Sequence, residues 1–158
     1  MIVPAAEEDL PEILRLQRMA FREEAEHVND PNIKPMSQTL EGLREESASS
    51  TVLKYVLDGE IVGSVRARMD GDVCHISRLV VHPDRWRMGI GRELVREVER
   101  RFSEARWFEL YTREDHDRTR PFYARLGYLP FRTERHSDTL TFVHLRRPGR
   151  PGDPCPED

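Results

Sequence analysis

The sequence has few cysteines and no clustered metal ligands, and each scarcity excludes a class of protein. Two cysteines in 158 residues, Cys74 and Cys155, are too few for a disulfide framework. The six histidines are scattered without the spacing of metal ligands. We therefore expect a protein held together by its hydrophobic core, with no metal site.

Long apolar runs are also missing. No stretch approaches the roughly 20 apolar residues that a membrane-spanning helix needs, and no signal-peptide pattern is present. The net charge of -4 argues against nucleic-acid binding, because an acidic domain would repel phosphates and no aromatic and basic surface stands out. We expect a cytoplasmic protein with no membrane or nucleic-acid partner.

The apolar pattern predicts one α/β domain with a mixed sheet over residues 1–147. Residues 148–158, rich in proline and charge, are expected to be a disordered tail. Helices are predicted from residue 7 onward and at 38–47, 90–102 and 118–126. Strands are predicted at residues 1–5, 51–57, 61–69, 76–81, 107–112, 129–135 and 139–145, with a hairpin turn at Gly59.

The most informative segment runs from His82 to Phe102 and reads HPDRWRMGIGRELVREVERRF. It follows an apolar strand, passes through a turn with Gly89 and Gly91, and enters an amphipathic helix. Glycine lets the backbone approach a ligand, and the first N–H groups of a helix attract anions. Basic side chains surround the turn, at Arg85, Arg87 and Arg92. This arrangement predicts a site for a diphosphate.

Two other phosphate-binding motifs do not fit this turn. A P-loop ends in Gly-Lys-Ser/Thr, whereas Gly91 is followed here by Arg92 and Glu93. A dinucleotide-binding fingerprint needs three glycines, and the turn has two. A Gly-x-Gly before a helix is by itself a weak signal, so a second motif has to decide its meaning.

That second motif lies downstream, where Pro121-Phe122-Tyr123-Ala124-Arg125-Leu126-Gly127-Tyr128 closes a short helix. It resembles the aromatic-Tyr-x-x-x-Gly-Phe/Tyr signature of the GNAT N-acetyltransferase superfamily. The turn at residues 86–91 resembles the superfamily's Arg/Gln-x-x-Gly-x-Gly/Ala, except that Trp86 replaces Arg or Gln. Both motifs occur in the expected order, and the resemblance covers about residues 1–147.

The resemblance implies a GNAT-like fold, β-αα-βββ-α-β-α-ββ, with splayed central parallel strands. It implies acetyl-CoA as cosubstrate, with the backbone of Leu79 stabilising the oxyanion and that of Val81 pairing with the pantetheine arm. His116 stands near the place where many relatives have an asparagine that touches CoA; its other interpretation is a residue of a polar loop. The full set of expected CoA contacts is Leu79, Val80, Val81, Arg87, Met88, Gly89, Ile90, Gly91, Arg92, His116 and Tyr123.

Two side chains are candidates for catalysis. The resemblance implies that Tyr123 is the general acid that protonates the leaving thiolate; on residue pattern alone it could be a core aromatic of its helix. His75 stands near the place where some relatives carry a catalytic glutamate, and a histidine can accept a proton near neutral pH. Its other interpretation is a histidine at a strand surface.

The acceptor is less constrained. Residues 22–46 carry an excess of acids that could attract a cationic amine, although charged helix faces are commonly just solvated. Their acids are Glu23, Glu24, Glu26, Asp30, Glu41, Glu45 and Glu46. We predict direct acetyl transfer to a small-molecule or peptide amine, since Cys74 in a strand does not suit a covalent intermediate. A non-catalytic acyl-CoA sensor, a structural domain with a vestigial turn, and a homodimer stay open.

Overall fold

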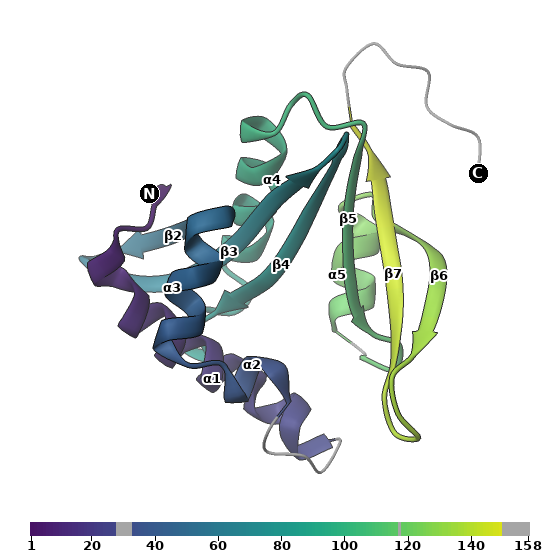
Figure 1. Ribbon diagram of the computed structural model, residues 1–158, viewed down its shortest axis with the longest axis horizontal. Coiled ribbons are helices and arrows are strands. Elements are labelled where there is room, and N and C mark those ends of the chain that lie inside the picture. Colours follow the sequence, from purple (N-terminus) through teal and green to yellow (C-terminus); the bar gives the residue numbers. More distant parts are fainter. Residues whose placement is uncertain (28–32, 117, 150–158) are drawn as a thin grey trace. The chain divides into compact units, whose positions relative to one another are not determined.

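The structure, a computed structural model, describes residues 1–27, 33–116 and 118–149. These residues form two compact units (Figure 1). The first comprises Met1–Arg68 and Arg78–Val98, and the second comprises Met69–Ser77 and the residues from Glu99 onward. The strands of the described chain form a sheet in the order β1-β2-β3-β4-β5-β7-β6.

In the first unit, an antiparallel meander forms the sheet. Strand β1 (Ile2–Pro4) pairs with β2 (Thr51–Leu57), and β2 pairs with β3 (Glu60–Asp70). The β2–β3 turn has left-handed backbone at both central residues, Asp58 with φ 53° and Gly59 with φ 79°. Two positive φ values in a two-residue hairpin match the right-handed twist of the strands. The hairpin predicted at Gly59 is therefore present.

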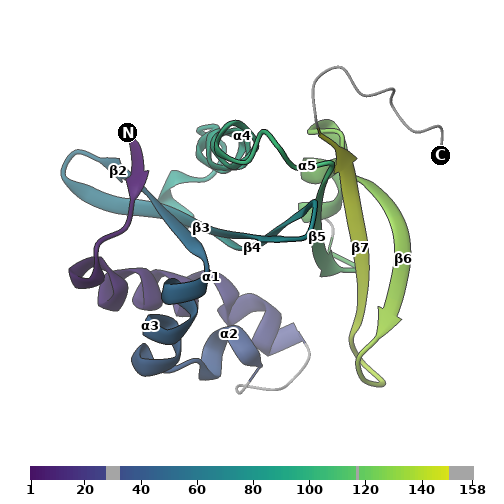
Figure 2. The same ribbon diagram turned by 45° about the horizontal axis from the view of Figure 1, so that its top comes forward.

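Helices cover both faces of these strands. Figure 2 shows α1 (Leu10–His27), α2 (Lys34–Ser37) and α3 (Leu40–Ser49) on one face and α4 (Ile90–Arg101) on the other. A short 3-10 turn, η1 (Glu7–Asp9), leads into α1. The Thr39 hydroxyl accepts the Gly42 N–H at 3.0 Å, which caps α3 and sets its start at Leu40.

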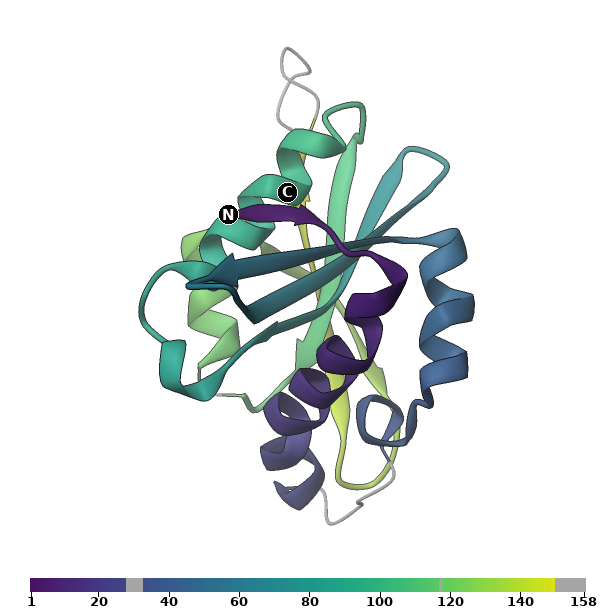
Figure 3. The ribbon, with the colours of Figure 1, turned by 90° about the vertical axis from the view of Figure 1, so that its left-hand side faces the viewer.

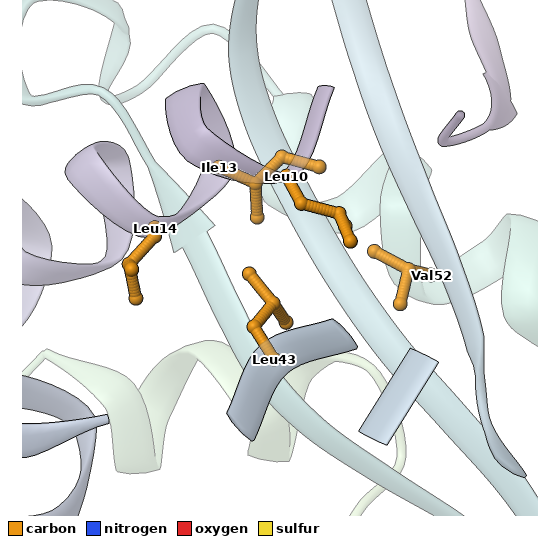
Figure 4. Close-up of a cluster of buried hydrophobic side chains, with 5 residues drawn as sticks. All are labelled: Leu10, Ile13, Leu14, Leu43 and Val52. Atoms are coloured by element: carbon orange, nitrogen blue, oxygen red, sulfur yellow. The ribbon is translucent and has the colours of Figure 1, made fainter. Parts of the chain in front are cut away.

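Side chains from α1, α3 and β2 form a buried apolar cluster, drawn in Figure 4: Leu10, Ile13, Leu14, Leu43 and Val52. Leu43 is fully buried, at 0 % exposed. Figure 3 shows α1 and α3 running next to each other, which lets one leucine of α3 reach three apolar side chains of α1. Burial of this stripe is what holds both helices on the sheet.

The second unit is built on a hairpin and one helix. Strand β7 (Thr141–Pro148) pairs antiparallel with both β5 (Trp107–Arg113) and β6 (Leu129–Arg135). The helix α5 (Thr119–Arg125) precedes β6. Buried residues alternate along the strands, at Phe108 and Leu110 of β5 and at Val143 and Leu145 of β7, which gives this sheet one apolar face.

Strand β4 (Val73–Val81) belongs to both units. Its first residues pair parallel with β5, from Val73 with Trp107 to His75 with Glu109. The units divide between Ser77 and Arg78, and Arg78 has a left-handed φ of 50° inside the strand. A non-glycine residue in that conformation interrupts the regular extended backbone.

The element order agrees with the predicted β-αα-βββ-α-β-α-ββ, and the mixed sheet is confirmed. Several boundaries differ by one to three residues, and one helix is additional. The helix predicted to include Phe102 ends at Arg101, and the short helix α2 was not predicted. The last strand extends to Pro148 because β5 offers pairing partners that far, up to Trp107 with Pro148. Of the predicted tail, residues 150–158 lie outside the described residues, as do residues 28–32 of the acceptor region.

Candidate functional site

The segment between β4 and α4 is a loop tied back to the end of its strand. After β4 the chain makes a 3-10 turn, η2 (Pro83–Arg85), in which the imidazole Nδ1 of His82 accepts the Asp84 N–H at 3.1 Å. The indole N–H of Trp86 donates to the Val81 carbonyl at 3.0 Å. Trp86, the residue that departs from the superfamily motif, thus anchors the loop to β4.

Two residues of this loop have left-handed backbone. Arg87 has φ 68° and Gly89 has φ 83°. A Cβ at Gly89 would meet nothing within 4 Å, so the conformation and not crowding favours glycine there. Helix α4 begins at the next residue, Ile90. Because the first N–H groups of a helix have no acceptor within it, they are available to an anion at the loop.

The start of α4 lies unusually close to the sheet. A Cβ added to Gly63 of β3 would lie 3.1 Å from Ile90 Cγ2, 3.1 Å from Leu94 Cδ1 and 3.2 Å from the Val80 carbonyl oxygen. Glycine at position 63 therefore allows the helix start to pack directly on β3 and β4. Sequence reasoning missed this residue, because a lone glycine in a strand gives no sign of which element approaches it.

The side chains of the loop divide by burial. Ile90 is buried and anchors the helix, whereas Arg87, Met88 and Arg92 are exposed. In β4, Val80 is buried, and Leu79 and Val81 are half-buried. The predicted CoA contacts from Leu79 to Arg92 therefore all lie in the first unit, and the charged side chains of Arg87 and Arg92 are exposed to solvent.

The other predicted site residues belong to the second unit. Tyr123 sits in α5, is 8 % exposed, and contacts the rings of Phe122 and Tyr128 at centroid distances of 5.0 and 6.1 Å. Burial raises the pKa of the Tyr123 phenol above its ordinary value. At neutral pH this tyrosine is therefore protonated.

The end of α5 explains the spacing of the second motif. The Tyr128 N–H donates to the Tyr123 carbonyl and the Gly127 N–H to the Ala124 carbonyl, both at 3.0 Å. With Gly127 at φ 95°, these bonds form a Schellman cap. The cap also brings together the two residues that flank it, so the Tyr-x-x-x-Gly-Tyr pattern places the Tyr128 ring against that of Tyr123.

A buried acid fixes the second of these tyrosines. The Tyr128 hydroxyl donates to Glu99 Oε2 at 2.8 Å, and an Arg147 guanidinium nitrogen lies 3.4 Å from Glu99 Oε1. Tyr128 is fully buried, and burial with the Glu99 carboxylate raises the pKa of its phenol. The motif thus supplies two protonated phenols, of which Tyr128 is held by an acceptor.

His116 caps the start of α5. Its Nδ1 accepts the backbone N–H groups of Arg118 at 3.3 Å and Thr119 at 3.4 Å. Because Nδ1 accepts, the neutral ring carries its proton on Nε2, and His116 presents an N–H donor. It also lines an open cavity of about 430 Å³ in the second unit, together with Glu114, Asp115, Arg120, Pro121, Ala124, Tyr128, Pro130 and Leu145.

The remaining candidates lie side by side in β4. The His75 side chain is 35 % exposed, and its Nε2 is 3.9 Å from Asp70 Oδ2. Cys74 is fully buried, and burial raises the pKa of its thiol to about 12. A thiol with that pKa is not nucleophilic near neutral pH, which disfavours Cys74 as an acetyl carrier.

Within the described ranges, no three His, Cys, Asp or Glu side chains form a group that could hold a metal ion. The described helices also include none that is long and apolar enough to cross a bilayer.

Comparisons with known proteins agree with this arrangement. A model of the acetyltransferase (GNAT) family matches residues 10–128. The chain is 26% identical over 136 residues to the UPF0157 protein YqkA of Bacillus subtilis, and it spans only 39% of that protein's length.

Two solved structures share the fold. The ribosomal-protein-S18-alanine N-acetyltransferase of Escherichia coli has a TM-score of 0.79 at 14% identity, with 97% of this chain and 96% of that chain covered. The PaiA N-acetyltransferase of Thermoplasma acidophilum, in complex with coenzyme A, has a TM-score of 0.70 at 17% identity, with 94% and 98% covered.

Proposed function

Because this chain belongs to the acetyltransferase (GNAT) family, we propose that it transfers the acetyl group of acetyl-CoA to a primary amine. The observation that carries the proposal is the loop before α4, where left-handed Arg87 and Gly89 lead into a free helix start. Backbone N–H groups in that arrangement suit a diphosphate, which is the most highly charged part of CoA. The complex of the Thermoplasma relative with coenzyme A supports the same ligand.

Binding in this proposal uses mainly the backbone. The first N–H groups of α4 hold the diphosphate, while Arg87 and Arg92 add exposed positive charge in a chain of net charge -4. The half-buried Val81 pairs with the pantetheine arm through its main chain, and Leu79 offers its N–H to the oxyanion. Met88, Gly89, Ile90 and Gly91 shape the loop.

The reaction is a single displacement. The amine nitrogen attacks the thioester carbon, the C–S bond breaks, and the sulfur leaves with the bonding electron pair. Tyr123, protonated at neutral pH, gives its proton to that sulfur, and the surplus proton of the attacking nitrogen restores the phenol. The ammonium form of the acceptor first loses a proton to His75 or to water. The raised pKa of Cys74 supports direct transfer over an acetyl-cysteine intermediate.

A panel assay tests the proposal. CoA thiol release from acetyl-CoA is followed with small amines, amino acids, aminoglycosides and N-terminal peptides as acceptors. Release that depends on an amine supports the transferase. Saturable acetyl-CoA binding without release for any acceptor would instead indicate a non-catalytic acyl-CoA sensor, and absence of binding would indicate a structural domain. The cytoplasmic location and the homodimer expected from the sequence stay predictions.

A further inference from the structure

A buried arginine in β3 organises the helices of the first unit. Arg66 is 1 % exposed, and its Nη1 donates to Glu46 Oε2 at 2.9 Å and to Gln38 Oε1 at 3.2 Å. Its Nη2 donates to Gln17 Oε1. Gln17 is buried too, and its amide donates to the Pro35 carbonyl at 2.8 Å. This network joins β3 to α1, α2 and α3.

A second arginine lies on the adjacent strand. The His82 N–H donates to the Val62 carbonyl at 2.8 Å, which sets these two residues beside each other on β4 and β3. The strands are joined by the short turn at Gly71 and Asp72, so they run antiparallel. Counting four residues back along β4 and four forward along β3 sets Arg78 beside Arg66. The Arg78 charge also contributes to lowering the pKa of Arg66, after burial as the main cause.

Both arginines keep an unused donor. Among the described residues, the Nε atoms of Arg66 and Arg78 are buried and have no hydrogen-bond partner. Arg66 is already occupied at both terminal nitrogens and is out of reach of solvent. Arg78 is half-buried, and its Nε but not its terminal nitrogens is among the buried unpartnered atoms, so a ligand can reach the Arg78 guanidinium at those terminal nitrogens.

The charges around this pair favour an anion. The Glu46 carboxylate is bound by Arg66, at 2.9 Å, and is 32% exposed, so this ion pair neutralises the charge of Arg66 and leaves that of Arg78. The acidic excess predicted for residues 22–46 is reduced by one charge, because Glu46 is bound to Arg66, which lies outside that segment. Two like charges that lie side by side are stabilised by a further carboxylate.

We propose that Arg78 binds a carboxylate of the acceptor, which makes the substrate class an amino acid or another small amine bearing a carboxylate. The inference rests on the proposed function and names the substrate of that site. The two terminal nitrogens of the Arg78 guanidinium can donate to the two oxygens of a carboxylate. Arg78 directly precedes Leu79, the proposed oxyanion donor, so a carboxylate there holds its own amine near the reacting carbon.

The test compares paired acceptors that differ in one charge, L-alanine with L-alaninamide and glycine with glycinamide. The parent protein is expected to prefer the carboxylate member of each pair. Arg78→Gln is expected to lower the carboxylate-to-amide ratio of kcat/KM by about 10- to 100-fold, the effect of losing charge-assisted hydrogen bonds. Arg78→Lys keeps the charge and loses the planar guanidinium. Its carboxylate-to-amide ratio is expected to lie between those of the parent and Arg78→Gln.

Arg68→Gln is the matched control, because Arg68 is an exposed arginine of the same strand β3. Its carboxylate-to-amide ratio is expected to stay at the parent value. Circular dichroism melting and acetyl-CoA affinity are recorded for every variant, so that a folding defect is separated from a loss of recognition.

Three results would overturn the inference: equal use of both members of a pair by the parent, an unchanged ratio in Arg78→Gln, or a preference for O-phosphoethanolamine over alanine. If no amine is acetylated at all, the proposed function fails. NMR titration with N-acetylalanine and N-acetylalaninamide then decides the inference alone. Carboxylate-selective binding lost in Arg78→Gln would support it, and equal binding of both ligands would overturn it.

Discussion

The two groups of candidate residues, one in each unit, are built in different ways. In the first unit, the loop before α4 relies on backbone conformation, with left-handed Arg87 and Gly89 and exposed side chains around them. In the second unit, α5 relies on buried side chains, with Tyr123 and Tyr128 packed together and protonated. A backbone-built site depends on which residues can adopt the conformation, whereas a side-chain site depends on one functional group.

This difference explains why one motif tolerates a change. Trp86 replaces the arginine or glutamine of the superfamily, yet its indole holds the loop to the Val81 carbonyl at 3.0 Å. Anchoring of the loop needs a donor of sufficient reach, which several residue types supply. The proton transfer proposed for Tyr123, in contrast, requires its hydroxyl.

The largest expected effect is on Tyr123→Phe, which removes that hydroxyl and keeps the ring. We expect kcat to fall by about 10²- to 10⁴-fold, the range for loss of a general acid. The dissociation constant of acetyl-CoA should change by less than about threefold, because phenylalanine keeps the aromatic ring at position 123 and its packing. Steady-state kinetics and calorimetric titration measure the two quantities.

Tyr128→Phe is the matched control, since it removes the hydroxyl that donates to Glu99 rather than the proposed acid. Its kcat should stay within about tenfold of the parent value. Equal kcat losses in the two variants would mean that packing of the tyrosine pair, and not proton transfer, limits turnover.

The next largest effect is expected at alkaline pH, which should lower the stability of the fold through its buried ionisable groups. Burial raises the pKa of Cys74 to about 12, and it raises the pKa values of Tyr123 and Tyr128 as well. The unfolded thiol ionises from about pH 8.5, so the unfolded state then binds fewer protons than the folded state. The free energy of unfolding should fall as pH rises, by up to about 1.4 kcal/mol per pH unit for each group.

Urea unfolding between about pH 8 and pH 11 measures this dependence. In Cys74→Ala the free energy of unfolding should fall less steeply with rising pH, because one of the groups that keep their proton in the folded state is removed. An identical slope in the variant would show that Cys74 is open to solvent in solution.

A smaller effect is expected at Gly89, where only the backbone conformation is at stake. Gly89→Val forces a branched residue into a left-handed φ and should raise the acetyl-CoA dissociation constant about tenfold, equivalent to about 1.4 kcal/mol. Gly59→Val is the matched control, because Gly59 is also left-handed with nothing within 4 Å of its Cβ position. Both variants should lose similar stability, and only Gly89→Val should lose affinity.

The smallest effect is expected for Trp86→Arg, which restores the residue usual in the superfamily. An arginine can donate to the Val81 carbonyl in place of the indole, so acetyl-CoA affinity should stay within about threefold of the parent. Trp86→Ala removes the donor and should weaken binding more. A larger loss in Trp86→Arg than in Trp86→Ala would show that the indole has a role beyond anchoring.

Much of the fold could be predicted because local signals agreed with the tertiary structure. The α4 periodicity, the hairpin at Gly59 and the helix stop at Gly127 all depend on neighbours in sequence. The helix end at the second motif could be predicted from residue spacing alone, because the Schellman cap joins residues that are close in sequence. The extension of β7 to Pro148 could not be predicted from the sequence, since it depends on pairing with β5.

The site residues that sequence reasoning missed have distant partners. Gly63 matters because Ile90 and Leu94 pack against it, and Arg66 matters because Gln17, Gln38 and Glu46 converge on it. None of these contacts joins residues near in sequence. At position 66 the sequence shows a charged residue in an apolar strand, which indicates a buried polar contact. It does not indicate which residues make that contact.

The most direct test follows the acetyl group itself. Acetyl-CoA labelled with ¹³C in its acetyl carbons is incubated with the protein and the best acceptor of the panel, and the label is located by NMR and mass spectrometry. We predict that the label moves to the acceptor nitrogen, at a rate that falls strongly in Tyr123→Phe. Label that stays on CoA, or that appears as free acetate whatever amine is present, would contradict it.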